Sequence, residues 1–271
     1  MSTTGRFARP QRLAASELFS TTDTEATEIA LGLLQITSLP SGPWNDPTAP
    51  GLGDDEKALL AEQWGIHDRG DWLGTIDHLT TVRRRRHVWM LHLSVRNDLH
   101  MALGRVPTAN EWLDTIAAEG GDERDARPFA RGIEHIEQEV RKRVGKEVVT
   151  PDLFVRTLDA YALGQAVAMT TWGVALGYAD VAEARRIIHR ISVETRPSFV
   201  SWTDFGLSYI AGCVMRWSDG TLDEDSFEKY GDVCGEFAAA ASAKRHGPWA
   251  TLPWPAPIDQ RSLRQHQYRI G

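Results

Sequence analysis

Apolar residues recur every three or four positions along most of this chain, which is the spacing of one helix face. No stretch alternates apolar and polar residues with the period of a strand. The pattern predicts an all-α fold, an irregular multi-helix bundle built from helix-turn-helix hairpins with about eight to ten helices. We expect helices over residues 23–36, 54–63, 69–79, 84–103, 108–119, 129–144, 151–176, 181–195, 199–217 and 224–244.

A short phrase that returns four times marks where helices end and begin. Glycine supplies the left-handed turn that ends a helix, and Asp or Thr caps the start of the next one. The four copies are Gly65 with Asp68, Gly104 with Thr108, Gly177 with Asp180, and Gly220 with Asp223. Their uneven spacing indicates reuse of helix hairpins rather than a regular repeat.

Two helices are expected to differ in how they meet the core. In residues 84–103, the apolar stripe predicts a core-facing side made of Val88, Leu91, Val95, Leu99 and Ala102. Residues 129–144 instead resemble an exposed helix with polar residues at 134, 135, 137 and 138. We expect two pairs of side chains four positions apart on that helix, Glu137 with Arg141 and Glu139 with Arg143.

Residues 160–179 carry no charge and are long enough to cross a bilayer. They are rich in Gly, Ala and Thr and poor in Leu, Ile and Phe, so we expect a central helix buried by its neighbours rather than a membrane span.

The chain is expected to divide into three parts. Residues 1–20 are expected to be mobile. Residues 21–245 are expected to form one helical domain, whose core at about 55–217 resembles the family described below. Residues 246–271, a tail rich in Pro and Trp, should lie extended over the surface.

The net charge and the cysteines limit which classes of partner and which cellular compartment we expect. A net charge of −7 argues against a general nucleic-acid binder, which needs clustered basic surface. One exception is the run Arg83, Arg84, Arg85 and Arg86, which could bind an anion or RNA or simply balance nearby acids. Cys213 and Cys234 have neither zinc-site nor redox spacing, so reduced thiols in a cytoplasmic protein are expected, as is the absence of a signal peptide.

Four motifs stand in order in the second half of the chain: Ala160-Tyr161-Ala162-Leu163-Gly164-Gln165, Trp172-Gly173, Gly177-Tyr178 and Ser201-Trp202-Thr203-Asp204-Phe205-Gly206. In these motifs the chain resembles a bacterial family known as domain of unknown function 1266. Where that family usually carries Asp and Arg, this chain has Ala162 and Gln165, which share a helix face. The resemblance implies a fold, but it implies no activity, since the family has none established.

Candidate chemistry is sparse. Phosphate-binding, dinucleotide-binding and zinc-protease motifs are absent, so no metal and no cofactor is expected. The strongest polar candidates are Arg96 and Asp98, which could meet Asp204 and His92 in a cleft. Such a cleft would indicate a hydrolase-like or nuclease-like enzyme.

The favoured hypothesis is a module that binds another protein, in a bacterial conflict or stress system, and that is not an enzyme. Aromatic residues often anchor protein interfaces, and this chain has ten Trp. The candidate interaction residues are Trp202, Trp217, Trp249 and Trp254. The sequence leaves the oligomeric state open.

Overall fold

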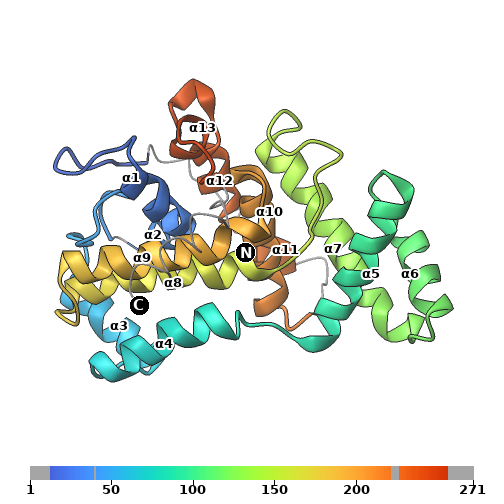
Figure 1. The fold of residues 1–271 in the computed structure, drawn as a ribbon, viewed down its shortest axis with the longest axis horizontal. Coiled ribbons are helices and arrows are strands. Elements are labelled where there is room, and N and C mark those ends of the chain that lie inside the picture. The colour runs from blue at the N-terminus through green and yellow to red at the C-terminus, as the bar shows by residue number, and fades with distance from the viewer. Residues whose placement is uncertain (1–12, 40, 221–225, 256–271) are drawn as a thin grey trace, which may run out of the picture.

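A computed structural model describes residues 13–39, 41–220 and 226–255, which fold into helices and connecting loops (Figure 1). The expected all-α, multi-helix fold is confirmed for these residues. The helices are α1 (Thr24–Ile29), α2 (Leu33–Ile36), α3 (Asp54–Trp64), α4 (Arg69–Thr81), α5 (His87–Leu103), α6 (Ala109–Ala118), α7 (Glu123–Val144), α8 (Asp159–Ala175), α9 (Val181–Thr195), α10 (Trp202–Trp217), α11 (Ser226–Tyr230), α12 (Cys234–Ala240) and α13 (Pro248–Thr251).

Helix α8 lies at the centre of the molecule, as expected, with α2, α4, α9 and α10 packed around it. Every residue from 159 to 173 is buried. Glycine allows the neighbours to come close, because a Cβ at Gly173 would lie 2.3 Å from the ring of Trp72. The same Trp72 donates its indole N–H to the Met169 carbonyl at 2.8 Å. No helix among the described residues is long and apolar enough to cross a membrane.

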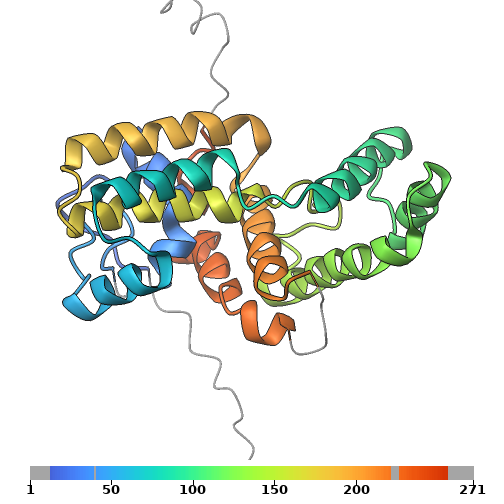
Figure 2. The ribbon, with the colours of Figure 1, turned by 90° about the horizontal axis from the view of Figure 1, so that it is seen from below.

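Helices α5, α6 and α7 form an arm that extends from this body (Figures 1 and 2). Helix α6 packs against both α5 and α7, and α7 returns to the body, where it packs against α10 and α12. Residues 82–86 connect α4 to α5 and carry the run of four arginines. This segment is called the arginine linker below.

The repeated glycine-and-cap phrase works as the sequence predicts. The four glycines, at positions 65, 104, 177 and 220, have φ values from 65° to 80°. The side chains of Asp68, Thr108 and Asp180 each accept the backbone N–H three positions ahead. The fourth cap, Asp223, lies outside the described residues. Local stop and start signals therefore set most helix boundaries.

The prediction for α5 was wrong in both its start and its orientation. The helix begins at His87 rather than at residue 84, because Arg83 and Arg84 have φ values of 53° and 52° and cannot continue a right-handed helix. Its buried residues are Trp89, Leu93 and Arg96 rather than the expected stripe. The ring of Trp89 stacks on Phe129 of α7 with centroids 5.8 Å apart, which turns the other face outward.

Helix α7 is longer than expected and is not a solvated helix. It begins at Glu123 and buries one complete face, which includes Ile133, Ile136 and Val140. The expected pair of Glu137 with Arg141 was wrong, because Glu137 lies on that buried face and pairs with Arg96 of α5. The second pair, Glu139 with Arg143, is present at 3.8 Å.

Three further segments differ from the expectation, in a helix break, in a helix start and in the conformation of the tail. Residues 226–244 form α11, α12 and a 3₁₀ turn instead of one helix, and the break falls at Gly231. Helix α8 begins at Asp159 rather than at Pro151. The described part of the tail, up to residue 255, contains α13 and a buried Trp249, so it is not extended over the surface. Residues 1–12 and 256–271, which belong to the two expected terminal segments, are outside the description.

Candidate functional site

The outward face of α5 carries a row of apolar side chains. Val88 and Leu91 are 49% and 52% exposed, Ala102 is exposed, and Val95 and Leu99 are partly buried. These five residues, called the α5 stripe, are spaced three or four positions apart and span about 21 Å of helix. They are the residues that the sequence pattern assigns to the core. An apolar face of this length on the outside of a helix is suited to receive a second helix.

Another side of α5 is joined to α7 by a buried ion pair. Arg96 donates to both carboxylate oxygens of Glu137, at 2.6 and 2.9 Å. Glu137 also accepts the Val155 backbone N–H at 2.7 Å. The guanidinium of Arg96 lies over the rings of Trp112 and Phe154, at 4.9 and 5.1 Å. Breaking such a buried pair leaves a charge without a partner, so this contact holds the stripe in a fixed orientation.

The expected polar cluster is not assembled. Arg96 pairs with Glu137, whereas Asp204 pairs with Arg156 and accepts the Val200 N–H at 3.0 Å. Burial raises the pKa of Asp204 despite these contacts. Asp98 is exposed on α5.

His92, the fourth candidate, packs its ring against Phe129 with centroids 5.7 Å apart, and burial lowers its pKa. A cavity of about 760 Å³ lies nearby, between α5, residues 150–159 and the start of α10. None of the four candidates lines it. The structure therefore places each in a separate environment and gives them no shared cleft.

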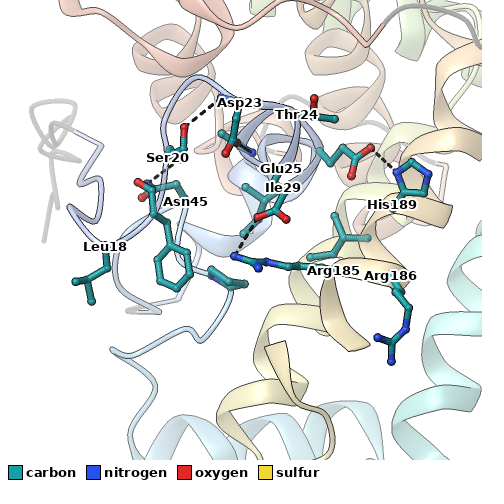
Figure 3. A pocket seen from close by; sticks show the side chains of 15 residues that line it. Leu18, Ser20, Asp23, Thr24, Glu25, Ile29, Asn45, Arg185, Arg186 and His189 are labelled. Atoms are coloured by element: carbon teal, nitrogen blue, oxygen red, sulfur yellow. Dashed lines mark hydrogen bonds and ion pairs between the residues drawn. The ribbon is translucent and has the colours of Figure 1, made fainter. Parts of the chain in front are cut away.

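A second cavity, of about 480 Å³, lies between α1, residues 18–23 and α9 (Figure 3). Its wall contains a buried carboxylate, Glu28, which accepts hydrogen bonds from His189 Nδ1 at 2.8 Å and from Arg196 at 2.9 Å. A carboxylate bound to one ring nitrogen orients the imidazole and leaves the other nitrogen available for proton transfer.

Among the described residues of this cavity, none supplies a nucleophile that is hydrogen-bonded to His189. Ser20, which lines it, accepts the backbone N–H groups of Thr22 and Asp23, and no described hydroxyl or thiol hydrogen-bonds to His189. Burial raises the pKa of Cys213 and Cys234 to about 12, so both thiols stay protonated near neutral pH and are weak nucleophiles. In this geometry Glu28 and His189 join α1 to α9.

Three of the four arginines of the linker form ion pairs with carboxylates. Arg83 and Arg85 both pair with Asp159, at 3.1 and 2.5 Å. Arg86 pairs with Asp219 and lies over the Trp89 ring at 4.4 Å. These three therefore hold the linker against α8 and against the turn that follows α10.

Arg84 differs from its neighbours. Its Nε donates to the amide oxygen of Gln165 at 2.7 Å, and the described residues provide no ion pair for it. Gln165 and Ala162, the two departures from the family pattern, are both buried in α8.

The four candidate tryptophans fall into two groups. Trp202 and Trp249 are only 5% exposed and stack on each other at 5.4 Å, and Trp254 packs edge-on against Trp202 at 4.9 Å. These three rings belong to the core at the end of the chain, so we correct their assignment as interaction residues. Trp217 is 59% exposed at the end of α10 and remains a candidate.

Glu137 was expected on an exposed helix face, although its position in the helix indicates that it is buried. Residues 133, 136, 137 and 140 fall on one side of a helical wheel, so a carboxylate at 137 lies among three apolar side chains. An acid in that place needs a cationic partner from another element. The partner could not be identified from sequence, because Arg96 lies 41 positions away.

The fold and these sites define a helical protein with a buried central helix and an arm that presents an apolar helix face. The chain belongs to the family described as protein of unknown function, DUF1266, whose model matches residues 59–254. The match extends beyond the 160–217 motifs in both directions and includes the tryptophan cluster near the end of the chain. No curated protein and no solved structure matches the chain.

Proposed function

We propose that this protein binds another protein and that the partner lays an amphipathic helix along the α5 stripe. The observation that carries the proposal is a row of five apolar side chains, three exposed and two partly buried, on a helix whose other side is held by the Arg96–Glu137 pair. Exposed apolar patches of this kind often mark interaction sites.

The spacing of the stripe favours a helical partner. Val88, Val95 and Ala102 are seven positions apart, with Leu91 and Leu99 between them, which resembles the seam of two packed helices. A different protein is favoured over a second copy, since each copy has a net charge of −7 and like charges repel. The partner helix is expected to present Leu, Ile or Val at matching positions.

A cytoplasmic location and a role in a conflict or stress system belong to the same proposal. The two cysteines support the location, because both keep their thiols in the described structure. The pathway rests on the sequence hypothesis alone, and the identity of the partner would establish it.

The test compares three tagged proteins purified from the organism that encodes the chain: the wild type, Leu91→Glu and Ser94→Glu. Leu91 lies in the stripe, whereas Ser94 is an exposed polar residue outside the stripe, about one helical turn further along. We expect one protein to copurify in near-stoichiometric amount with the wild type and with Ser94→Glu. Leu91→Glu should lose it, because a buried carboxylate without a partner is costly.

Light scattering on the purified chain tests whether a second copy of the chain, rather than a different protein, occupies the stripe. A wild-type dimer that Leu91→Glu converts to a monomer would show that the stripe binds a second copy. Equal recovery of the partner with all three proteins would place the interface elsewhere and overturn the proposal. A wild type that is monomeric and binds no protein would overturn it as well.

A further inference from the structure

A third cavity, of about 610 Å³, lies beside α12 and α13, which Figure 1 labels. Its walls come from residues 13–22, from Trp44 and from residues 239–251, so it joins the two ends of the described chain. Sites for small organic molecules commonly have volumes of about 300–1,000 Å³. The cavity is therefore large enough for a ligand of that kind.

The charged side chains that line this cavity are cations. Lys244 and Arg245 are exposed and line it side by side, and His246 follows them. None of the described lining residues is Asp or Glu, whereas the two cavities described above both have carboxylates in their walls. No acid of the described chain forms an ion pair with Lys244 or Arg245. The lining therefore favours an anion.

Neutral groups in the walls supply further hydrogen-bond donors. Trp44 is only 3% exposed, and the described residues give its indole N–H no acceptor. The buried rings of Trp72 and Trp172 differ, because each donates its N–H to an oxygen of the chain. Thr21 and Thr22, which also line the cavity, carry hydroxyl groups. A ligand with several acceptor oxygens would satisfy these donors.

Backbone contacts hold both walls in place. The Trp44 backbone N–H donates to the Ala14 carbonyl at 3.0 Å. On the other side, the Gly247 N–H donates to the Ser242 carbonyl at 3.0 Å and closes the turn that carries the two cations. A Cβ at Gly247 would lie 2.2 Å from the Ala240 carbonyl oxygen, so this turn packs directly against the end of α12. Walls that are ordered in advance lower the entropy cost of binding.

We propose that this cavity binds a small molecule through its phosphate group. A phosphate ester carries a charge of about −1.5 to −2 near neutral pH, which Lys244 and Arg245 together match. Lysine provides a point charge, and arginine provides a fork of N–H donors that fits phosphate oxygens. Leu13, Trp44 and Pro248 provide an apolar wall for the organic part of the ligand.

This site does not depend on the proposed function, because no residue of the α5 stripe is among the described residues that line the cavity. Leu91→Glu should leave phosphate binding unchanged. Variants of Lys244 and Arg245 should leave recovery of a protein partner unchanged. The two proposals can therefore fail separately.

The test is calorimetric titration of the purified full chain with phenyl phosphate, inorganic phosphate and benzoate, at an ionic strength matched with sodium chloride. The double variant Lys244→Gln/Arg245→Gln removes both cations. Its matched control is Arg124→Gln/Lys146→Gln, which removes the same charge at two exposed positions that are not among the described lining residues.

We expect saturable binding of phenyl phosphate to the wild type and to the control. The double variant should bind it at least about tenfold more weakly, because it loses charge-assisted hydrogen bonds. Trp44→Phe keeps an aromatic ring without the N–H and should weaken binding severalfold, with circular dichroism as the check that it folds. An unchanged affinity in a folded Trp44→Phe would contradict the assignment of Trp44 as a donor.

The three ligands distinguish the source of the affinity. Phenyl phosphate should bind more tightly than inorganic phosphate, because the apolar wall contacts its ring, and more tightly than benzoate, which carries a single charge. Benzoate that binds as tightly as phenyl phosphate would identify a carboxylate site and overturn the proposal. Inorganic phosphate that binds as tightly as the ester would overturn the assignment of an organic ligand. Heats no larger than those of sodium chloride, or equal weakening in the double variant and its control, would overturn the site itself.

Discussion

Helices α8 and α5 have the same length and are both rich in apolar residues, yet the fold treats them in opposite ways. Helix α8 contains Gly and Ala where neighbours cross it, and it is buried on all sides along residues 159–173. Helix α5 has large apolar residues on two sides, but neighbours bury the side with Trp89 and Leu93 fully and the α5 stripe only in part. The contrast shows that apolar content decides whether a helix can be buried. The shapes of the neighbouring elements decide which face of the helix becomes buried.

The largest expected effect comes from removing a buried ring of α8 itself. Trp172 is fully buried and donates its indole N–H to the Ser41 hydroxyl at 2.9 Å. Trp172→Ala should lower the free energy of unfolding by about 3–5 kcal/mol, because it leaves a cavity. Urea denaturation measures the loss.

Leu91→Ala on the α5 stripe is the matched comparison for that variant. Half of this side chain is already in water, so we expect a change within about 0.5 kcal/mol. Equal losses for the two variants would mean that α5 is as buried as α8, which contradicts the contrast.

A smaller effect tests the close packing of α8 directly. Gly173→Ala would push a Cβ into the Trp72 ring at 2.3 Å, and we expect it to cost about 1–3 kcal/mol. Gly74→Ala in α4 has no atom within 4 Å of the added Cβ, so it should stabilise the protein by about 0.4–1 kcal/mol. Thermal melts of the two variants should therefore shift in opposite directions. A stabilised Gly173→Ala would show that α4 and α8 do not approach so closely.

The smallest expected effect concerns the arm and depends on pH. A hydrogen bond from Arg105, with further bonds from Thr108, lowers the pKa of Glu111 from 4.5 to about 2. Since the folded protein favours the ionised form, this stabilisation is present above pH 4.5 and is lost as the pH falls toward 2. Glu111→Gln should therefore lower the melting temperature at neutral pH, with a difference that shrinks on acidification.

Asp114→Asn, on the exposed side of α6, is the matched control for that experiment. It should change the melting temperature less than Glu111→Gln does at neutral pH. A difference between wild type and Glu111→Gln that stays constant down to pH 2 would contradict the assignment of the low pKa to Glu111.

The sequence by itself determined the helical class and most helix boundaries. The signals act within four residues: glycine at a left-handed turn, as at Gly104, and a capping side chain, as at Asp180. Such signals need no knowledge of the rest of the fold, so Gly65 and Thr108 could be assigned directly. The burial of α8 was also predictable, because no residue of that helix after Asp159 carries a charge.

The tertiary structure alone decided which groups meet. The outward face of α5 depends on Phe129 of α7, and the partner of Glu137 lies 41 positions away in Arg96. The four arginines of the linker are adjacent in the sequence, but three of them pair with the carboxylates of Asp159 and Asp219, whereas Arg84 bonds to the Gln165 amide. Electrostatic pairing and packing depend on distance in space, and residue spacing along the chain does not reveal that distance once it exceeds a few helical turns.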